Sequence, residues 1–291
     1  MKVLIFGATG FVGKKLQTLL TQKGHTVVAT DQRRDRDWPF KVASCDAVVN
    51  LAGTPIFGKR WNDRIKSQIF DTRVHGTEKI FEEMKALAEG DPKKTLPKVY
   101  VSASAIGFYS SRGDEILTET SEGGTDFLAF TCRNWEEQAQ KMQGSLGVRT
   151  VLLRFGIILG KDGGALEKML PPFKLGVGGK IGNGRQWMSW VHIDDICEMI
   201  AWALENSEAR GTYNAVSPQP VTNSEFTKVL GKTLGRPTIF PIPKIGMYVL
   251  FGEAASILVG SQRVVPQKLE KEGFKFKFST LDMALENILK T

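Results

Sequence analysis

The sequence predicts an α/β protein in which helices cover both faces of a doubly wound parallel sheet, followed by a smaller, mostly helical C-terminal lobe. Short apolar segments without a polar face recur at residues 2–6, 25–30, 47–51, 99–102 and 150–154. Longer helical patterns lie between them. Strands that are apolar on both sides are typical of parallel sheets buried on both faces. Right-handed crossovers between such strands give the doubly wound arrangement.

The elements follow from local signals. A helix is expected over 11–22, closed near Gly24, and further helices over 63–87 and 127–143. Beyond residue 155 the chain becomes rich in glycine and proline, and from residue 221 it is mostly helical with three proline interruptions. We therefore expect a first domain over 1–220, with insertions at about 156–190, and a C-terminal lobe over 221–291.

Composition narrows the class of protein. The 291 residues are 42% hydrophobic and 24% charged, which is ordinary for a globular protein. No apolar run is long enough to span a bilayer, and the first strand is too short for a secretion signal, so the cytoplasm is the expected location. The three cysteines and three histidines show neither disulfide nor metal-ligand spacing. We expect no metal site and no membrane partner.

The net charge of +8 could indicate nucleic acid. Because the cations are spread along the chain and no basic stretch is interleaved with aromatic residues, a solvated basic surface that attracts an anionic cofactor is the preferred interpretation. We expect no nucleic-acid partner.

A glycine-rich turn lies between the first strand and the first helix. Gly7 permits the tight turn, Gly10 lets the backbone approach a pyrophosphate, and Gly13 lets the helix pack on the sheet. The helix N-terminus then favours the phosphate charge. The turn, with Thr9, Phe11 and Val12, predicts a Rossmann domain that binds a nicotinamide dinucleotide, NAD(P)(H). The alternative is a structural turn.

Charged residues at the end of the second strand bear on the choice of dinucleotide. Asp31 lies where an acid would bind the adenosine ribose and disfavour a 2′-phosphate, which favours NAD. Arg33 and Arg34 follow at once, and either could pair with that phosphate. A loop of solvated charges is the alternative.

The chain resembles the extended, epimerase-like branch of the short-chain dehydrogenase/reductase superfamily. The resemblance rests on the segments Asn50–Gly53 and Trp190–Asp195. A narrower likeness, to epimerase family proteins with a C-terminal DUF1731 domain, is carried by Ser102–Tyr109, Trp135-Glu136, Leu153–Gly160, Gly163–Ala165 and Val265–Phe274. It places the DUF1731-like part from about residue 240.

The resemblance implies that the protein binds NADP and places further residues against the cofactor. These are Leu51, Ala52 and Gly53 at the end of the third strand, Gln68 and Arg73 on the long helix after that strand, Ser102 in the fourth strand, and Arg154 closing the fifth. For Gln68, Arg73 and Arg154 the alternative is a surface salt bridge.

The superfamily's catalytic set is incomplete. Its chemistry uses a serine together with tyrosine and lysine spaced Y-x-x-x-K, and none of the four tyrosines here is followed by lysine at that spacing. Ser104 remains at the end of the fourth strand, where it could polarise a substrate oxygen, and Tyr109 could reach the same cleft. A capped strand end and a packed loop tyrosine are the alternatives.

Other polar residues have simpler expected roles. We expect Cys132 to pack in the core and Asp194 and Asp195 to cap the helix that follows them.

Two functions remain open. The first is an oxidoreductase or epimerase acting on a small carbonyl or alcohol, with Ser104 polarising the oxygen and Tyr109 or water supplying the proton. A phenol without a neighbouring ammonium stays near its ordinary pKa of about 10, which favours carbonyl reduction over alcohol oxidation. The second is a dinucleotide-binding regulator or scaffold without turnover. A small-molecule substrate is the expected partner, and a homodimer is left open.

Overall fold

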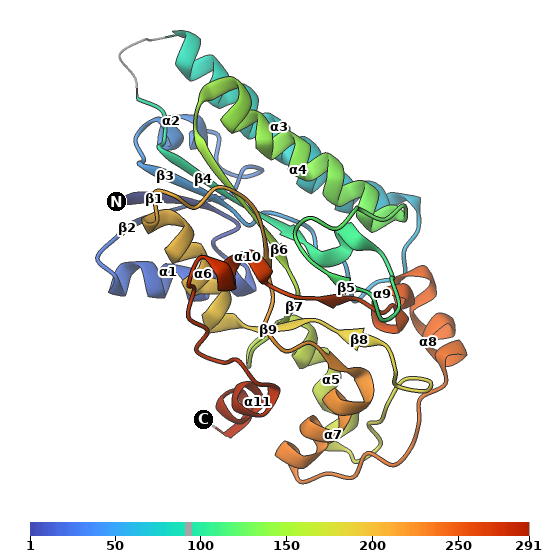
Figure 1. The fold of residues 1–291 in the computed structure, drawn as a ribbon. Coiled ribbons are helices and arrows are strands. Elements are labelled where there is room, and N and C mark those ends of the chain that lie inside the picture. Colours follow the sequence, from blue (N-terminus) through green and yellow to red (C-terminus); the bar gives the residue numbers. More distant parts are fainter. Residues whose placement is uncertain (91–94, 291) are drawn as a thin grey trace.

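A six-stranded parallel sheet forms the centre of the computed structural model, which describes residues 1–90 and 95–290. Its strand order is β10-β6-β4-β3-β1-β2 (Figure 1). The strands are β1 (Lys2–Phe6), β2 (Thr26–Thr30), β3 (Ala47–Asn50), β4 (Val99–Ala105), β6 (Arg149–Phe155) and β10 (Gly211–Ala215). The predicted fold class is confirmed. Five strands match the predicted segments, and β10 was missed.

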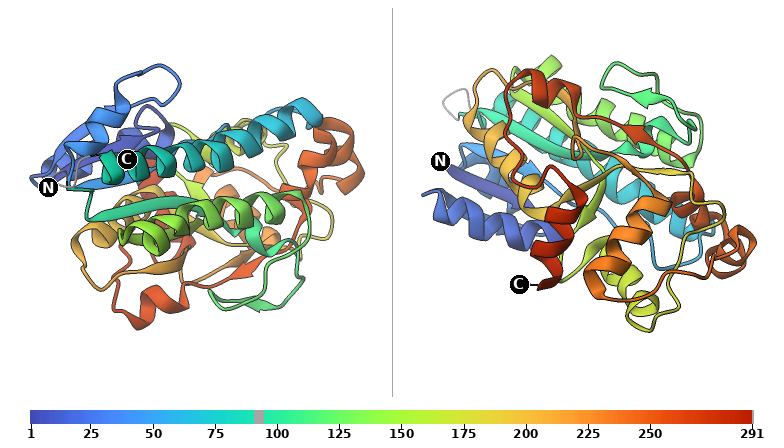
Figure 2. Two further views of the ribbon diagram at one scale, coloured as in Figure 1. Left: turned by 90° about the horizontal axis from the view of Figure 1, so that it is seen from above. Right: turned by 60° about the horizontal axis from the view of Figure 1, so that its bottom comes forward.

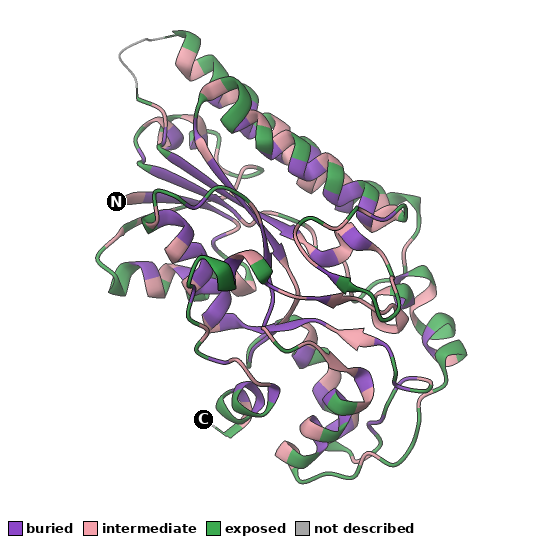
Figure 3. Cartoon of the chain, in the orientation of Figure 1, coloured by how far each residue is buried: buried purple, intermediate pink, exposed green. Residues whose placement is uncertain are grey.

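Helices cover both faces of this sheet. One face carries α1 (Phe11–Gln22) and α6 (Ile193–Glu205), and the other carries α2 (Trp38–Ala43), α3 (Asp63–Gly90) and α4 (Phe127–Leu146). Figure 2 shows α3 and α4 running side by side. Alternate residues of β1 divide between the two cores, because Val3 and Ile5 pack with α1 and α6 whereas Leu4 and Phe6 pack with the other layer. The sheet is therefore buried on both sides, as its continuous apolar strands require (Figure 3).

A second, smaller core lies beyond the carboxyl ends of the strands. It is built from β7 (Ile157–Leu159), α5 (Gly164–Lys174), β8 (Trp187–Met188), β9 (Trp190–His192), β11 (Val221–Thr222), α7 (Asn223–Leu234) and α11 (Leu281–Lys290). Between α7 and α11 come α8 (Lys244–Phe251), η2 (Gly252–Ala255), α9 (Ser256–Val259), β12 (Arg263–Val264) and α10 (Gln267–Lys271). The predicted lobe over 221–291 ends in residue 291, which lies outside the described residues. None of the described helices combines the length and apolar character that a bilayer crossing needs.

The C-terminal segment folds back onto the first domain. β12 pairs in parallel with β5 (Ile116–Leu117), a short strand that follows η1 (Ile106–Tyr109). The Asp195 carboxylate accepts hydrogen bonds from the backbone N–H groups of Lys277 and Phe278 at 2.8 and 3.0 Å. The predicted capping role of Asp194 and Asp195 is wrong, because the side chain of His192 caps α6 and Asp195 instead holds the returning chain.

Candidate functional site

The glycine-rich turn lies where the strand order reverses direction. β1 is followed by β2 on one side, and β3 then pairs on the other side of β1, so the loops after β1 and β3 meet at this switch point. Gly7 has a φ of +79°, and a Cβ there would lie 2.8 Å from the carbonyl carbon and oxygen of Leu51. In open α/β sheets such a point is the usual ligand crevice.

Gly10 and Gly13 have different surroundings. A Cβ on Gly13 would lie 2.2 Å from the Gly7 carbonyl oxygen, so the packing of α1 on the turn requires glycine. A Cβ on Gly10 would meet only that oxygen, at 3.2 Å, and Gly10 itself is exposed with an ordinary φ of −74°. No side chain caps α1 at Gly10. The first N–H groups of the helix are therefore left for an anion.

The residues around Gly10 contribute in different ways. Thr9 is exposed at the tip of the turn, and Val12 is half-buried. The Phe11 ring points away from the turn, into the loop Gly160–Gly164, where a Cβ on Gly160 or Gly163 would come within 2.6 Å of it. Phe11 thus fastens the start of α1 to the loop that leads into α5.

The carboxylate of Asp31 interacts with residues of its own loop. It accepts a hydrogen bond from the Arg33 N–H at 2.9 Å, and the Nε atoms of Arg33 and Arg34 lie 3.6 and 3.8 Å from its two oxygens. Both arginine side chains are mostly exposed, at 77% and 86%. The acid is thus partly neutralised, while both guanidinium groups remain open to a further anion.

Arg73 lies directly against the loop after β3. A Cβ on Gly53 would lie 3.0 Å from its guanidinium carbon, and Arg73 Nη1 donates to the carbonyl oxygens of Thr54 and Ile69 at 3.0 and 3.1 Å. The guanidinium also stands over the Trp135 ring. Burial lowers the pKa of Arg73 to about 10, so it stays charged at neutral pH. Within residues 1–90 and 95–290 no carboxylate pairs with it.

A buried polar network crosses the carboxyl ends of β4 and β6. Arg154 donates from Nε and Nη2 to the two carboxylate oxygens of Glu136, each at 2.8 Å, and from Nη1 to the Tyr109 hydroxyl at 2.8 Å. Ser104 Oγ donates to Glu136 Oε1 at 2.6 Å. The Tyr109 hydroxyl lies 2.7 Å from Asn214 Oδ1, as a donor to it. We call these five residues the Glu136–Arg154 network; each of them is at least 95% buried.

This network changes the chemistry expected of Tyr109. The phenol was expected to have no cationic neighbour, and the structure places Arg154 against it. Burial nevertheless raises the pKa of Tyr109, and the Arg154 charge only works against that rise. The hydroxyl also lies within donor distance of the Thr118 carbonyl oxygen at 2.9 Å. Tyr109 is therefore enclosed and hydrogen-bonded, with no side-chain surface open to solvent.

The remaining predicted residues lie around the same edge of the sheet. Leu51 and Ala52 are half-buried beyond β3, and Ser102 is buried within β4, where its hydroxyl donates to the Ala103 carbonyl oxygen at 3.1 Å. Gln68 lines a small hollow of about 170 Å³. The other residues lining that hollow are Thr54, Pro55, Phe57, Lys59 and Ile65.

One face of α4 lies against the end of β4 and η1. Leu128, Cys132 and Glu136 follow one another at four-residue spacing, and a Cβ on Gly107 would lie 3.2 Å from Leu128 and 3.8 Å from the Cys132 sulfur. Burial raises the pKa of the Cys132 thiol to about 12. The helix thus offers the end of β4 an apolar side chain, a protonated thiol and a carboxylate.

Two members of the network were missed by the sequence argument. Glu136 was noted only as part of a Trp-Glu motif, and Asn214 lies on the strand that was not predicted. The spacing of Leu128, Cys132 and Glu136 on one helical face is the signal that could have drawn attention to Glu136.

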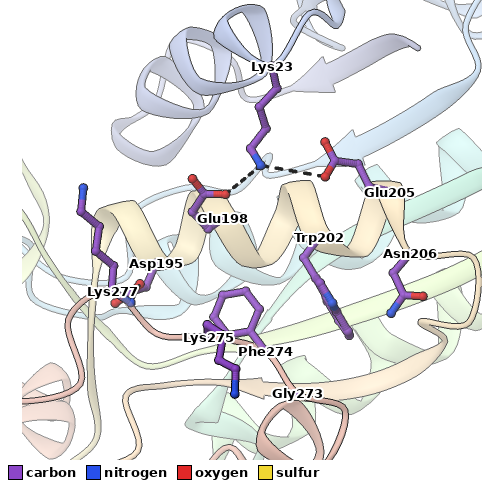
Figure 4. Close-up of a pocket in the computed structure, with 10 residues that line it drawn as sticks. All are labelled: Lys23, Asp195, Glu198, Trp202, Glu205, Asn206, Gly273, Phe274, Lys275 and Lys277. Atoms are coloured by element: carbon purple, nitrogen blue, oxygen red, sulfur yellow. Dashed lines mark hydrogen bonds and ion pairs between the residues drawn. The ribbon is translucent and has the colours of Figure 1, made fainter.

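A larger hollow than the one beside Gln68 lies elsewhere. Figure 4 shows it between α6 and the segment Gly273–Lys277, with a volume of about 630 Å³. Lys23 spans it by ion pairs to Glu198 at 3.0 Å and Glu205 at 3.9 Å. None of the predicted site residues lines it, so it is separate from the dinucleotide crevice.

Comparison with known proteins agrees with this geometry. Residues 3–216 match the model of the NAD dependent epimerase/dehydratase family, and residues 242–288 match a domain of unknown function, DUF1731. An epimerase family protein of Arabidopsis thaliana, described as a chloroplastic SDR39U1 homolog, is 36% identical, with 100% of this chain and 87% of the relative covered. The epimerase family protein YfhF of Bacillus subtilis is 35% identical, with 99% and 98% covered.

A solved structure is also close. The human epimerase family protein SDR39U1, isoform 2, crystallised with NADPH, matches with a TM-score of 0.91 and 33% identity over the whole of both chains. The resemblance predicted from the sequence is confirmed, and this chain belongs to the NAD dependent epimerase/dehydratase family.

Proposed function

We propose that this chain binds NADP(H) at the turn between β1 and α1 and acts as a reductase of a small carbonyl compound. The observation that carries the proposal is the uncapped N-terminus of α1 at the switch point, where Gly10 leaves room for a phosphate. The human relative crystallised with NADPH supports the same cofactor. A hydride is the chemistry that the reduced cofactor supplies.

The loop after β2 favours NADP over NAD in this proposal. Asp31 was expected to favour NAD, but its carboxylate accepts from the Arg33 N–H and lies near both arginine side chains. Two exposed guanidinium groups are available to pair with a ribose 2′-phosphate, whereas the Asp31 carboxylate that would repel it is already paired. We propose that Arg33 and Arg34 decide the preference.

Ser104 and Arg73 are the groups proposed to act on the substrate side. The Glu136 carboxylate already receives two hydrogen bonds from Arg154, so the Ser104 hydroxyl can turn from it toward a carbonyl oxygen without leaving a bare charge. Arg73 supplies a permanent cation with no carboxylate partner in the described part of the chain. Together they would stabilise negative charge that develops on the oxygen.

Water is the proposed proton source, and reduction is the proposed direction. Tyr109 is enclosed and bonded to Asn214 and Arg154, so it holds Arg154 in place. The raised pKa values of Tyr109 and Cys132 leave both groups protonated at neutral pH. Neither can therefore serve as the base that alcohol oxidation requires.

A second function is favoured by one observation. Leu128 and Cys132 lie on the face of α4 that is turned toward Gly107, and neither side chain transfers a proton near neutral pH. A dinucleotide-binding regulator without turnover would fit a helix face that lacks the tyrosine and lysine pair.

Titration and a reductase screen separate these functions. Cofactor-free protein is titrated calorimetrically with NADPH and with NADH, and then assayed with NADPH against small aldehydes, ketones and quinones. We expect tighter binding of NADPH, and Arg33→Ala with Arg34→Ala to weaken it about tenfold or more while NADH is little affected, as for the loss of charged hydrogen bonds.

Three results would count against the proposal. Equal affinities for the two cofactors would contradict the assigned role of the arginines. Absence of binding would contradict the cofactor site itself. Tight binding without turnover of any substrate would favour the regulator.

A further inference from the structure

We infer that the surface around α8 binds the face of an anionic phospholipid bilayer, with the chain lying on the membrane rather than crossing it. Exposed apolar side chains are concentrated on this surface. Eight of the thirteen large apolar side chains that are exposed lie in two segments, the loop after α5 and the stretch that leads into and through α8. They are Leu175, Val177, Ile239, Phe240, Ile245, Tyr248, Val249 and Leu250. We call this set the α8 surface.

The two segments form one surface because their backbones are joined. The Ile242 N–H donates to the Lys180 carbonyl oxygen, and the Gly182 N–H donates to the Ile242 carbonyl oxygen, each at 2.8 Å. A Cβ on Gly176, between Leu175 and Val177, would lie 3.8 Å from Pro237. Figure 1 shows α8 at the outer edge of the molecule, and Figure 3 shows that it is mostly exposed.

Apart from Lys244 in its first turn, the exposed side chains of α8 are uncharged. Ile245, Tyr248 and Val249 lie on one side of the helix, where they are 77%, 46% and 66% exposed, and Leu250 is 65% exposed on another side near its end. Met247, on the opposite side, is buried against Ile181 and Ala255. An uncharged helix side facing water is unfavourable unless another apolar phase covers it.

The surrounding charge identifies that phase. The stretches 168–193 and 226–252 contain no Asp or Glu and eight cations, all exposed. These are Lys168, Lys174, Lys180, Arg185, Lys228, Lys232, Arg236 and Lys244. The whole chain has 39 Lys and Arg against 31 Asp and Glu, so the remainder balances at 31 of each and these two stretches account for the entire net charge of +8.

The cations themselves are spread along the chain, as expected from the sequence, but their excess over the acids is concentrated in these two stretches. This concentration also decides between occupants. In a twofold dimer the same patch would face itself, and cations would oppose cations. Nucleic-acid grooves favour arginine and stacking aromatic rings, whereas this surface is mainly lysine and aliphatic. An anionic bilayer offers both an apolar phase and negative charge that attracts each nearby Lys or Arg.

The proposal departs from the expectation of no membrane partner. That expectation rested on the lack of an apolar run long enough to cross a bilayer, which a helix lying in the interface does not need. α8, with Lys244 at its start and apolar side chains along its exposed side, has the residue types of such a helix.

Vesicle sedimentation with the full chain tests the inference. We expect the protein to sediment with phosphatidylcholine vesicles that contain phosphatidylglycerol, and to bind pure phosphatidylcholine at least tenfold more weakly. Raising the salt from 0.1 to 1 M, which shortens the Debye length from about 10 to 3 Å, should release much of the bound protein. Val249→Glu should weaken binding about tenfold or more, because it replaces an aliphatic side chain that the membrane interface would bury.

Matched variants keep the test specific. Phe40→Glu alters an equally exposed apolar residue of α2, at 72%, and Lys85→Glu reverses an exposed cation of α3. Neither should change vesicle binding, whereas Lys174→Glu with Lys244→Glu should reduce it. NADPH titration of every variant checks the fold and keeps this result separate from the proposed reductase.

The inference is overturned by any of three results. These are no sedimentation with anionic vesicles, equal binding to neutral vesicles, or binding that Val249→Glu leaves intact. A dimer in light scattering that Val249→Glu dissociates, without vesicle binding, would assign the surface to a second copy instead.

Discussion

Arg154 and Glu136 form a bidentate ion pair, with 2.8 Å from Nε to one carboxylate oxygen and 2.8 Å from Nη2 to the other, and each residue is only 5% exposed. Arg112 and Glu115 form the same bidentate pair at the same distances on the surface, with side chains 32% and 46% exposed. The chain thus contains one ion-pair geometry in two environments.

The first prediction uses that contrast. Glu136→Gln should lower the free energy of unfolding by about 3–5 kcal/mol, because it leaves a buried guanidinium without a counter-charge. Glu115→Gln should cost less than about 1 kcal/mol, since water screens the exposed pair. Urea denaturation of both variants measures the difference. Similar losses would show that burial does not set the strength of the inner pair.

The second prediction separates two glycines of the turn. Gly10→Val should fold with near-normal stability and fail to bind NADPH, because its side chain would occupy the place of the phosphate. Gly13→Ala should lose about 1–3 kcal/mol of stability, because its methyl group would overpack against the Gly7 carbonyl oxygen. Calorimetry with NADPH and thermal denaturation check the pair. Normal affinity in folded Gly10→Val would refute the assigned phosphate site.

The third prediction concerns Ser104 and Tyr109. Ser104→Ala should reduce turnover by about 10²-fold, as for loss of a positioned donor, and should lower stability by about 1–3 kcal/mol, because Glu136 loses a buried hydrogen bond. Tyr109→Phe should lower stability by about 1–3 kcal/mol, because Asn214 and Arg154 each lose a buried partner, and should reduce turnover less. The rate of NADPH oxidation and the unfolding midpoint are measured for both. A larger turnover loss in Tyr109→Phe would make the phenol, rather than water, the proton donor.

The fourth prediction is a pH effect at the start of α6. His192 Nδ1 accepts from the Asp194 N–H at 3.0 Å, and its ring packs on Phe278. Burial lowers the pKa of His192 to about 4. The folded protein therefore holds neutral imidazole, and the stability contribution is complete above the unfolded pKa of about 6.5 and is lost as the pH falls through about 4.

The loss of stability caused by protonation of His192 can be measured against a variant that does not titrate. Between pH 7 and pH 4 the loss from His192 should be on the order of 3 kcal/mol. His192→Asn keeps a helix-capping side chain but does not titrate, so its stability should fall less over the same range. Urea unfolding of both proteins at the two pH values gives the difference. Parallel losses would place the acid sensitivity in other groups.

The sequence predicted the elements whose signals are local. Five strands of the central sheet are built around short apolar runs, and the turn at Gly7 carries its own pattern. β10 was missed because Gly211, Thr212 and Asn214 make up most of it, and Asn214 is buried only because Tyr109 and Val265 supply its partners. A polar residue satisfied by tertiary contacts cannot be recognised by periodicity.

The site was predicted unevenly for the same reason. Residues of the turn and of the loop after β3 could be assigned because each has a fixed place in the dinucleotide-binding βαβ unit. The hydrogen-bonded partners in the Glu136–Arg154 network lie 18, 32, 45 and 105 residues apart, so only the folded chain brings them together. The domain limits, the cytoplasmic location, the homodimer and the roles of the individual site residues stay predictions.

The return of the C-terminal segment onto the first domain has a consequence for biosynthesis. Asp195 receives the N–H groups of Lys277 and Phe278, and Asn214 donates to the Val265 carbonyl oxygen, so residues of the first domain are satisfied by segments that are translated after it. Until those segments leave the ribosome, the aspartate and the asparagine lack these partners. The first domain therefore cannot complete its own hydrogen bonding during synthesis, and its late partners have to find it by long-range contacts.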